Sequence, residues 1–172
     1  MRAAGGLEDL LSGSTRLAVL GVGSELRADD GAGMLAAREL ERRCPRRTDL
    51  LVAIGGSAPE NLTGVIADFG PSHLVIVDCA DLGLAPGAVR VVRVEGIGGL
   101  SASTHSLPLK IVVDYLILRC PCEVIAVGIQ PKSLDFDGRM SRAARAAAGR
   151  VAKSLAAAVR AMDARSRRDG SG

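Results

Sequence analysis

Two aspartates and a histidine stand out in this chain because of where they fall relative to its apolar runs. Asp30 closes a glycine-bearing loop after the apolar run 17–20, and Asp78 follows four consecutive apolar residues. His105 lies in a segment of small and polar residues, 96–106. Two carboxylates and an imidazole form a mixed oxygen and nitrogen donor set, which suits a borderline divalent ion such as nickel or zinc. Three ligands also leave coordination positions open for a group that arrives from outside.

Each of these residues also has a structural interpretation. Asp30, or its neighbour Asp29, could cap the helix that follows. Asp78 could accept hydrogen bonds from backbone N–H groups of its own loop, and His105 could be an ordinary loop residue. An unpaired carboxylate at the end of an apolar strand is costly, so Asp78 must be compensated by something.

Apolar strands alternate with helix-periodic segments along the chain, and these elements must position the three residues. The strand at 88–94 is expected to be antiparallel or at an edge, because only a loop precedes it and a parallel return needs a crossover. The alternation predicts an α/β protein, a three-layer α/β/α sandwich with a mostly parallel five-stranded sheet. Strands are expected at 17–22, 50–54, 73–79, 88–94 and 123–128, and helices at 31–43, from 57 onward, at 108–119 and at 141–164.

The carboxyl ends of parallel strands share one edge of a sheet, where ligands and chemistry gather. Adjacent strands lie about 4.8 Å apart, so Asp30 and Asp78 are expected to converge there, with His105 folding over the same edge. In the segment 55–61, GGSAPEN, Ser57 suits an N-cap and Glu60 follows three residues later. This spacing is more typical of a capping box than of a catalytic pair.

Size and composition narrow the function further. The 172 residues predict one domain at 16–164, with an N-terminal extension at 1–15 and a flexible tail at 165–172. Aromatic residues make up only 2% and the net charge is +3, which argues against nucleic-acid binding. No apolar run reaches the roughly 18 residues of a membrane span, and no signal pattern opens the chain. A cytoplasmic protein without membrane insertion is expected.

Several common chemistries fit the sequence poorly. The four cysteines are interpreted as free thiols in core or loops, because Cys120 and Cys122 are too closely spaced for a CxxC unit. A serine triad lacks the GxSxG elbow. Gly21 and Gly23 begin a dinucleotide fingerprint, but Leu26 stands where its third glycine belongs.

Five motifs together resemble those of the maturation endopeptidases of [NiFe] hydrogenases. GGSAPEN, THSLPL and GIQP resemble the branch that acts on formate-hydrogenlyase-type and energy-converting membrane-bound hydrogenases. The resemblance covers about residues 16–131, in the right order. The motifs are GVGSELRADDGAG at 21–33, GGSAPEN at 55–61, VIVDCADLGLAPG at 75–87, STHSLPL at 103–109 and GIQP at 128–131.

The resemblance places the family's metal-binding and catalytic residues at Asp30, Asp78 and His105, whereas Asp29 matches an acid that is not the usual ligand. It implies an aspartyl-type peptide-bond hydrolase that removes the C-terminal extension of a [NiFe]-hydrogenase large-subunit precursor after nickel insertion. The nickel is then borne by the substrate and recognised transiently, and no organic cofactor is needed. An open three-ligand site makes physical sense of such recognition, since it completes the coordination of a delivered ion.

This sequence departs from the family pattern at two positions, and two other functions stay open. Ile54 stands where relatives commonly have Asp, and Ser24 replaces the Asn of a GxGN turn. A nickel-sensing chaperone that binds the precursor without cutting it would use the same three residues. A phosphate- or nucleotide-binding α/β module is the third alternative.

Overall fold

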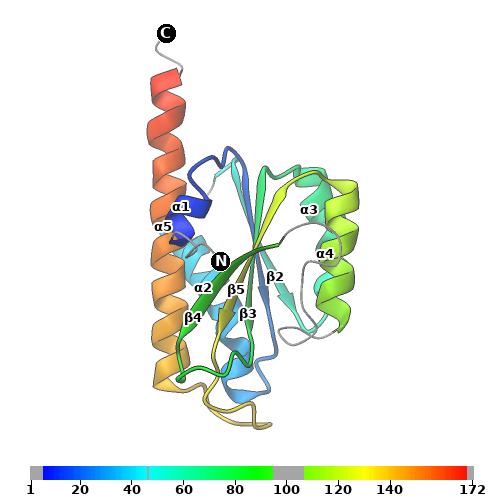
Figure 1. Ribbon diagram of the computed structural model, residues 1–172, viewed down its shortest axis with the longest axis vertical. Helices are drawn as coiled ribbons and strands as arrows, with labels where there is room; N and C mark the ends of the chain where they lie inside the picture. The colour runs from blue at the N-terminus through cyan, green and yellow to red at the C-terminus, as the bar shows by residue number, and fades with distance from the viewer. Residues whose placement is uncertain (1–5, 46, 95–106, 170–172) are drawn as a thin grey trace.

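The computed structural model describes residues 6–45, 47–94 and 107–169, which fold into a sheet between two helical layers (Figure 1). The predicted α/β/α sandwich is confirmed. The strands are β1 (Leu17–Val22), β2 (Leu50–Gly56), β3 (His73–Cys79), β4 (Val89–Val94) and β5 (Glu123–Ile129). The α-helices are α1 (Leu7–Leu10), α2 (Ala32–Arg43), α3 (Thr63–Phe69), α4 (Leu107–Arg119) and α5 (Arg142–Asp169), and the 3-10 helices are η1 (Ala28–Gly31) and η2 (Pro59–Leu62).

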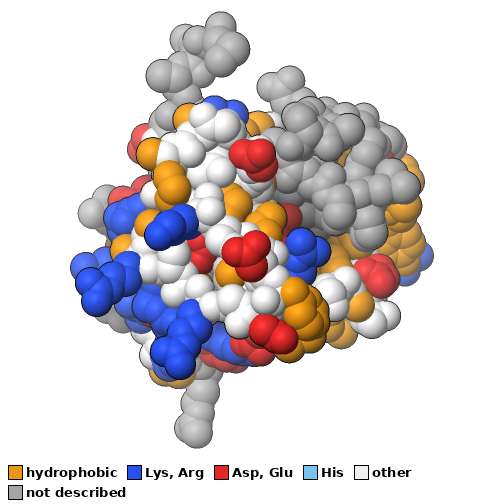
Figure 2. All heavy atoms as spheres, turned by 90° about the horizontal axis from the view of Figure 1, so that it is seen from below, with side chains coloured by type: hydrophobic (Ala, Val, Ile, Leu, Met, Phe, Trp, Pro, Cys, Tyr) orange, Lys and Arg blue, Asp and Glu red, His pale blue; other side chains and the backbone are white. Residues whose placement is uncertain are grey.

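The five strands lie in the order β2-β1-β3-β5-β4. All neighbouring pairs are parallel except β4 with β5, as the loop before β4 predicted. Gly21 of β1 pairs with Val77 of β3, so these two strands end side by side. Figure 2 views the molecule from this carboxyl edge, on which the loops after β1, β3 and β5 lie.

Each face of the sheet packs against its own helices, because strand side chains alternate between the faces. Leu17 and Val19 join the core under α1, α2 and α5, whereas Ala18 and Leu20 join the core under α3 and α4. The apolar stripe of α5 supplies the first core with residues at helical spacing, namely Val151, Leu155, Val159 and Met162.

Glycines let α2 approach the sheet more closely than any side chain would permit. A Cβ atom on Gly33 would lie 2.2 Å from the carbonyl oxygen of Val77 and 2.5 Å from that of Val22. One on Gly21 would lie 2.7 Å from the carbonyl oxygen of Gly33. The start of α2 is therefore pressed against the ends of β1 and β3, and the two acids that precede the helix are brought to the same place.

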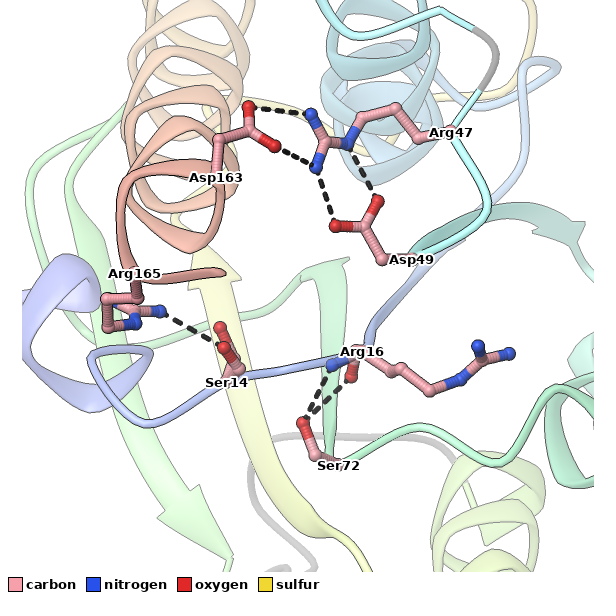
Figure 3. A network of polar contacts seen from close by, with 7 residues as sticks. All are labelled: Ser14, Arg16, Arg47, Asp49, Ser72, Asp163 and Arg165. Carbon is pink, nitrogen blue, oxygen red and sulfur yellow. Dashed lines mark hydrogen bonds and ion pairs between the residues drawn. The ribbon is translucent and has the colours of Figure 1, made fainter. Parts of the chain in front are cut away.

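The opposite, amino edge is held by charged and polar contacts (Figure 3). Arg47, just before β2, donates to Asp49 at 2.6 and 2.8 Å and to Asp163 of α5 at 2.7 and 2.8 Å. These paired hydrogen bonds raise the pKa of the Arg47 guanidinium. Arg165 donates to the Ser14 carbonyl oxygen at 3.0 Å. A cleft of about 800 Å³ opens beside this network, but the charges of Arg47, Asp49 and Asp163 on its wall are already paired with one another.

The structure corrects the prediction for GGSAPEN. Ser57 does not cap a helix and Glu60 does not complete a capping box: Ala58 precedes η2, no side chain caps it, and α3 begins only at Thr63. Pro59 explains the difference, since proline at the first helical position starts the turn without needing a side-chain cap. Thr63 Oγ1 donates instead to the Glu60 carbonyl oxygen at 2.9 Å.

Other boundaries also differ from the prediction. The last helix, α5, runs to Asp169 rather than ending at 164. Leu7 and Leu11, in the segment taken as an extension, are buried in the core beside α5. All four cysteines are free thiols, as predicted. In the part of the chain that the structure describes, no helix combines the length and apolarity needed to cross a membrane.

Candidate active site

Asp30 and Asp78 meet at the carboxyl edge, as the sheet topology predicted. Asp30 lies in η1, directly after the β1 loop, and Asp78 is the last residue but one of β3. Burial raises the pKa of the Asp30 carboxyl, and the nearby Asp78 carboxylate raises it further. The Ser24 backbone N–H and the Arg27 charge act in the opposite direction without cancelling that rise. Two carboxyls held this close favour a cation or a shared proton between them.

The loop after β1 closes tightly around Asp30. Gly23 adopts a φ of 129°, and a Cβ atom there would lie 1.8 Å from the Asp30 carbonyl oxygen. The Ser24 backbone N–H donates to Asp30 Oδ2 at 2.9 Å, and the Asp30 N–H donates to the Arg27 carbonyl oxygen. Since the backbone makes the contact to Asp30, serine in place of asparagine at position 24 preserves it.

Asp78 is 7% exposed, and its Oδ1 accepts a hydrogen bond of 2.8 Å from the Cys79 backbone N–H. The structural interpretation of Asp78 is thus observed, and it is compatible with ligand binding because a carboxylate has about four acceptor positions. Burial raises the pKa of the Cys79 thiol, and the negative charges of Asp78, Asp30 and Asp29 raise it further. In the protein alone, Cys79 is therefore a neutral thiol.

Asp29 has a different role from its neighbour. It is fully buried, and its carboxylate accepts hydrogen bonds from the Ser141 N–H at 2.5 Å, the Ser141 hydroxyl at 2.9 Å and the Lys132 N–H at 2.7 Å. Burial acts to raise the Asp29 pKa, but these hydrogen bonds outweigh it and lower the pKa overall. Asp29 thus fastens the 131–141 loop and the beginning of α5 to η1.

Neither acid caps α2, contrary to the structural alternative drawn from the sequence. Gly31 is the N-cap residue, and no side chain bonds to the first turn of the helix. The capping position that does use a hydroxyl is Ser141, whose Oγ accepts from the Ala144 N–H at 3.1 Å. The negative charge of Asp29 lies beside that helix start, where the helix dipole favours an anion.

Gln130 is a site residue that the sequence reasoning did not single out, although it stands in the GIQP motif. Its side-chain oxygen accepts from the backbone N–H groups of Leu82 and Leu84 at 2.7 and 3.2 Å. Its amide nitrogen donates to Asp81 Oδ1 and to the Pro131 carbonyl oxygen, both at 3.3 Å. Gln130 therefore fixes the loop that follows Asp78.

Ile54 belongs to the core rather than to the site. It lies in β2, pairs with Gly21 of β1 and is a partly buried hydrophobic residue packed against the core beneath α2. Position 54 therefore contributes an apolar contact to the core rather than a third acid near the carboxyl edge.

The third predicted ligand, His105, lies outside the described residues. Among the residues that are described, no group of three or more His, Cys, Asp or Glu side chains is placed to hold a metal ion. The structure therefore brings together two of the three predicted ligands, and both offer the hard oxygen donors of a carboxylate.

Exposed apolar and basic side chains lie on the carboxyl edge of the molecule. Figure 2 shows acidic side chains near the middle of this face and Lys and Arg side chains gathered on the side of α5. Leu26 and Phe136 are 59% and 70% exposed, on two loops joined by a bridge between Arg27 and Phe136 and by a hydrogen bond from the Asp137 N–H to the Leu26 carbonyl oxygen. An exposed apolar surface on fixed loops is typical of a protein-docking edge.

The fold and this edge together define a class: α/β/α proteins whose polar site lies beyond the carboxyl ends of parallel strands. Known proteins identify the family. The profile of the hydrogenase maturation protease family HycI matches residues 34–158. This chain belongs to that family, and it is a hydrogenase maturation endopeptidase.

Individual relatives agree with the family match. A putative hydrogenase maturation protease of Methanocaldococcus jannaschii is 34% identical over 136 residues, which span 76% of this chain and 80% of the relative. The hydrogenase 3 maturation protease of Escherichia coli K12 is 38% identical over 119 residues, or 69% of this chain and 74% of the relative. The crystal structure of the [NiFe] hydrogenase maturation protease HycI from Thermococcus kodakarensis superposes with a TM-score of 0.81 at 32% identity, covering 90% of this chain and 98% of that one.

Proposed function

We propose that this endopeptidase removes the C-terminal extension of a [NiFe]-hydrogenase large-subunit precursor, and that it recognises nickel already held by that precursor. The observation that carries the proposal is the proximity of Asp30 and Asp78 at the carboxyl edge. The Asp78 carboxylate raises the pKa of Asp30, and the charges of both acids raise the pKa of the Cys79 thiol. The family membership supplies the peptide-bond chemistry. The proposed cleavage takes place at this carboxyl edge and needs no organic cofactor.

Asp30 and Asp78 are the proposed recognition residues, with His105 as the third ligand predicted from the sequence. Two carboxylates that repel one another are stabilised when a cation lies between them. A nickel ion delivered by the substrate would accept these oxygen donors while still bound to the precursor. Binding the ion would also fix the neighbouring peptide bond in reach of the site.

The residues of this chain then act on a positioned substrate. Asp30, held by the Ser24 backbone N–H at 2.9 Å, would present its carboxylate to the substrate ion. Asp78, held by the Cys79 N–H, keeps a fixed orientation toward the substrate ion. A substrate-borne divalent ion polarises a carbonyl and activates water.

The experiment that tests this function mixes the protein with nickel-loaded and nickel-free precursor and measures the mass of the precursor's C-terminus. The wild-type protein should shorten only the nickel-loaded form. Asp30→Asn and Asp78→Asn should each reduce the rate by at least about a hundredfold, since each removes a charged ligand. Asp68→Asn is the matched control and should process at the wild-type rate, because Asp68 is an exposed aspartate near the end of α3, outside the candidate site.

Two outcomes would contradict the proposal. Normal processing by both edge variants would show that the acids do not recognise the substrate. An intact C-terminus in a stable complex with the wild-type protein would show that it binds without cutting, as a chaperone does. Circular dichroism of each variant separates loss of the site from loss of the fold.

A further inference from the structure

Among the described residues, the outer edge of β4 is an unpaired strand edge. β4 ends the sheet and pairs with β5 alone, and no other element in the described part of the chain pairs with it. Two hydrogen bonds fix which backbone groups point outward. The Gln130 N–H donates to the Ala88 carbonyl oxygen across the β4–β5 pair, whereas the Ile129 carbonyl oxygen accepts from Ala80 on the opposite side. By alternation, Arg90 and Val92 turn their backbone groups toward β5.

Val89, Val91 and Arg93 consequently direct their backbone N–H and C=O groups away from the sheet. Such a row of groups is the template on which an extended peptide adds a strand. Their side chains lie on the α5 face, because Val89 and Val91 pack against the core on that side. The side chains of Arg90 and Val92 point to the other face and are exposed.

A groove follows this same edge on the α5 face. Its volume is about 270 Å³, and it accepts one or two apolar side chains of moderate size. β4 and β5 form its floor, α5 its wall and α1 one end. The lining residues are Leu7, Val89, Val91, Val127, Arg150, Val151 and Ser154.

The rim of the groove is basic. Arg150 lines the groove and is exposed, and its side chain reaches across to donate to the Gly87 carbonyl oxygen at 2.8 Å. Arg93, whose side chain lies on the same face, pairs with Glu123 at 2.8 Å, so its charge is offset by an acid. Arg150 is the one charged residue among the described residues that line the groove, and its positive charge favours a peptide that carries acidic residues or a carboxylate.

The edge begins at the candidate active site. Asp78 of β3 pairs with Gly128 of β5, and Gly128 pairs with Arg90 of β4, so one row across the sheet joins the acid to the strand edge. β4 starts at this carboxyl edge and runs away from it. A chain leaving the site can therefore follow the outer edge of β4 without turning back.

We propose that the outer edge of β4 binds the first residues of the precursor's C-terminal extension as an added strand, with alternate side chains in the groove. This inference rests on the proposed function. Residues before the cleaved bond belong to the folded, nickel-bearing part of the precursor, which docks at the acids. The extension is the free end of the precursor chain, so it can lie along a strand edge as an extended peptide.

Val91→Pro tests the backbone contact. Proline at this position removes an outward N–H and leaves the hydrogen bonds to β5 in place. The Michaelis constant for nickel-loaded precursor should rise about three- to tenfold, the effect of one backbone hydrogen bond. Val92→Ala, on the same strand with its side chain on the other face, is the control and should leave this constant unchanged.

Ser154→Leu tests the groove without altering β4, and Lys153→Leu on the exposed face of α5 is its control. Filling the groove should weaken processing to a similar degree. The decisive substrate is a precursor whose extension is shortened to two residues. This substrate should be processed equally by the wild-type, Val91→Pro and Ser154→Leu proteins, because it lacks the residues that would contact the β4 edge and the groove.

Direct binding separates this inference from the proposed function. A synthetic peptide of the extension sequence should shift the backbone amide resonances of β4 in the wild-type protein and not in Val91→Pro. Cleavage by the wild-type protein with no such shift, and with equal constants for both variants, would overturn the β4 inference and leave the proposed function standing. A concentration-dependent dimer that Val91→Pro abolishes would assign the edge to a second copy and would equally overturn it.

Discussion

Adjacent acids in one loop have opposite physical states. Asp29 is fully buried and its pKa is lowered by three donors, so its charge stabilises the fold. Asp30 is partly buried and its pKa is raised by burial and by Asp78, so its ionised form is unfavourable in the folded protein. A residue held in an unfavourable state while its neighbour is fully satisfied is typical of a functional position.

Asparagine substitutions should separate the two acids by stability alone. Asp29→Asn should lower the free energy of unfolding by about 2–3 kcal/mol, because it weakens charge-assisted hydrogen bonds to Ser141 and Lys132. Asp30→Asn should change it by less than about 1 kcal/mol in either direction, since it also removes repulsion from Asp78. Urea unfolding at pH 7 measures both. Equal losses would mean that Asp30 is as structural as Asp29.

At the scale of elements, the site depends on how closely α2 approaches the sheet. Gly33 carries no side chain where a Cβ would lie 2.2 Å from a backbone oxygen of β3. Backbone atoms cannot yield as the end of a flexible side chain can. The position of both acids is thus set by the absence of side chains in α2 as much as by the acids themselves.

Alanine at two helical glycines should have opposite effects. Gly33→Ala should destabilise the protein by more than about 3 kcal/mol or prevent folding, because the added methyl group overlaps the Val77 carbonyl oxygen. Gly64→Ala on α3, where nothing lies within 4 Å, should stabilise it by about 0.5 kcal/mol through helix propensity. Thermal unfolding by circular dichroism reads both. A tolerated Gly33→Ala would show that α2 can move away from β1 and β3.

The ion clamp between β2 and α5 is a second contact between elements. Arg47→Ala should cost about 1–3 kcal/mol, because it leaves Asp49 and Asp163 without the cation that joins them and because Arg47 is only 20% exposed. Arg43→Ala, which breaks an exposed i,i+4 pair with Glu39, should cost no more than about 0.5 kcal/mol. Urea midpoints of the two variants test the difference, and a cost for Arg47 as small as that for Arg43 would contradict it.

At the scale of the whole molecule, the candidate site and the stabilising polar contacts lie at opposite edges of the sheet. The carboxyl edge carries Asp30, whose pKa is raised, the neighbouring Asp78 and the exposed apolar loops. The amino edge carries satisfied ion pairs and hydrogen bonds that close the fold. Changes at the amino edge should therefore alter stability with little effect on processing. Changes at Asp30 and Asp78 should slow processing with little effect on stability.

His73, at the amino edge, makes this division measurable by pH. Burial lowers its pKa below the ordinary 6.5, the Arg93 and Arg165 charges lower it too, and Glu123 acts in the opposite sense. Below pH about 6.5 the unfolded chain therefore binds a proton that the folded chain resists, and the free energy of unfolding falls by up to about 1.4 kcal/mol per pH unit until the folded pKa is passed.

Urea unfolding at pH 7.5 and 5.5 should show this loss in the wild-type protein. The His73→Gln variant should lose less stability between the two values, because its side chain does not titrate. Parallel behaviour of the two proteins would remove His73 as the cause.

Much of this molecule could be predicted from local patterns, and the remainder depends on contacts that such patterns do not record. Apolar runs predicted the four parallel strands, and the short loop before β4 predicted an antiparallel or edge strand, because both are properties of neighbouring residues. Ser141 lies 112 residues from Asp29 and Asp163 lies 116 residues from Arg47, and nothing in a local spacing identifies these partners. The Ser57 cap was wrong because Pro59 shifted the start of the turn. The meeting of Asp30 and Asp78 could be predicted because strand order alone decides it.

The 3-10 form of η1 has a consequence for how the acidic pair is compared among related chains. Successive residues of such a helix are rotated by about a third of a turn. Asp29 therefore faces the interior while Asp30 faces the site, and the two positions are not interchangeable. If the doublet were shifted to positions 30 and 31, no acid would stand at position 29 to accept the hydrogen bonds from Ser141 and Lys132, and a second charge would stand at the buried position 31. Alignments of relatives should treat the two columns as separate traits, even where one acid appears to substitute for the other.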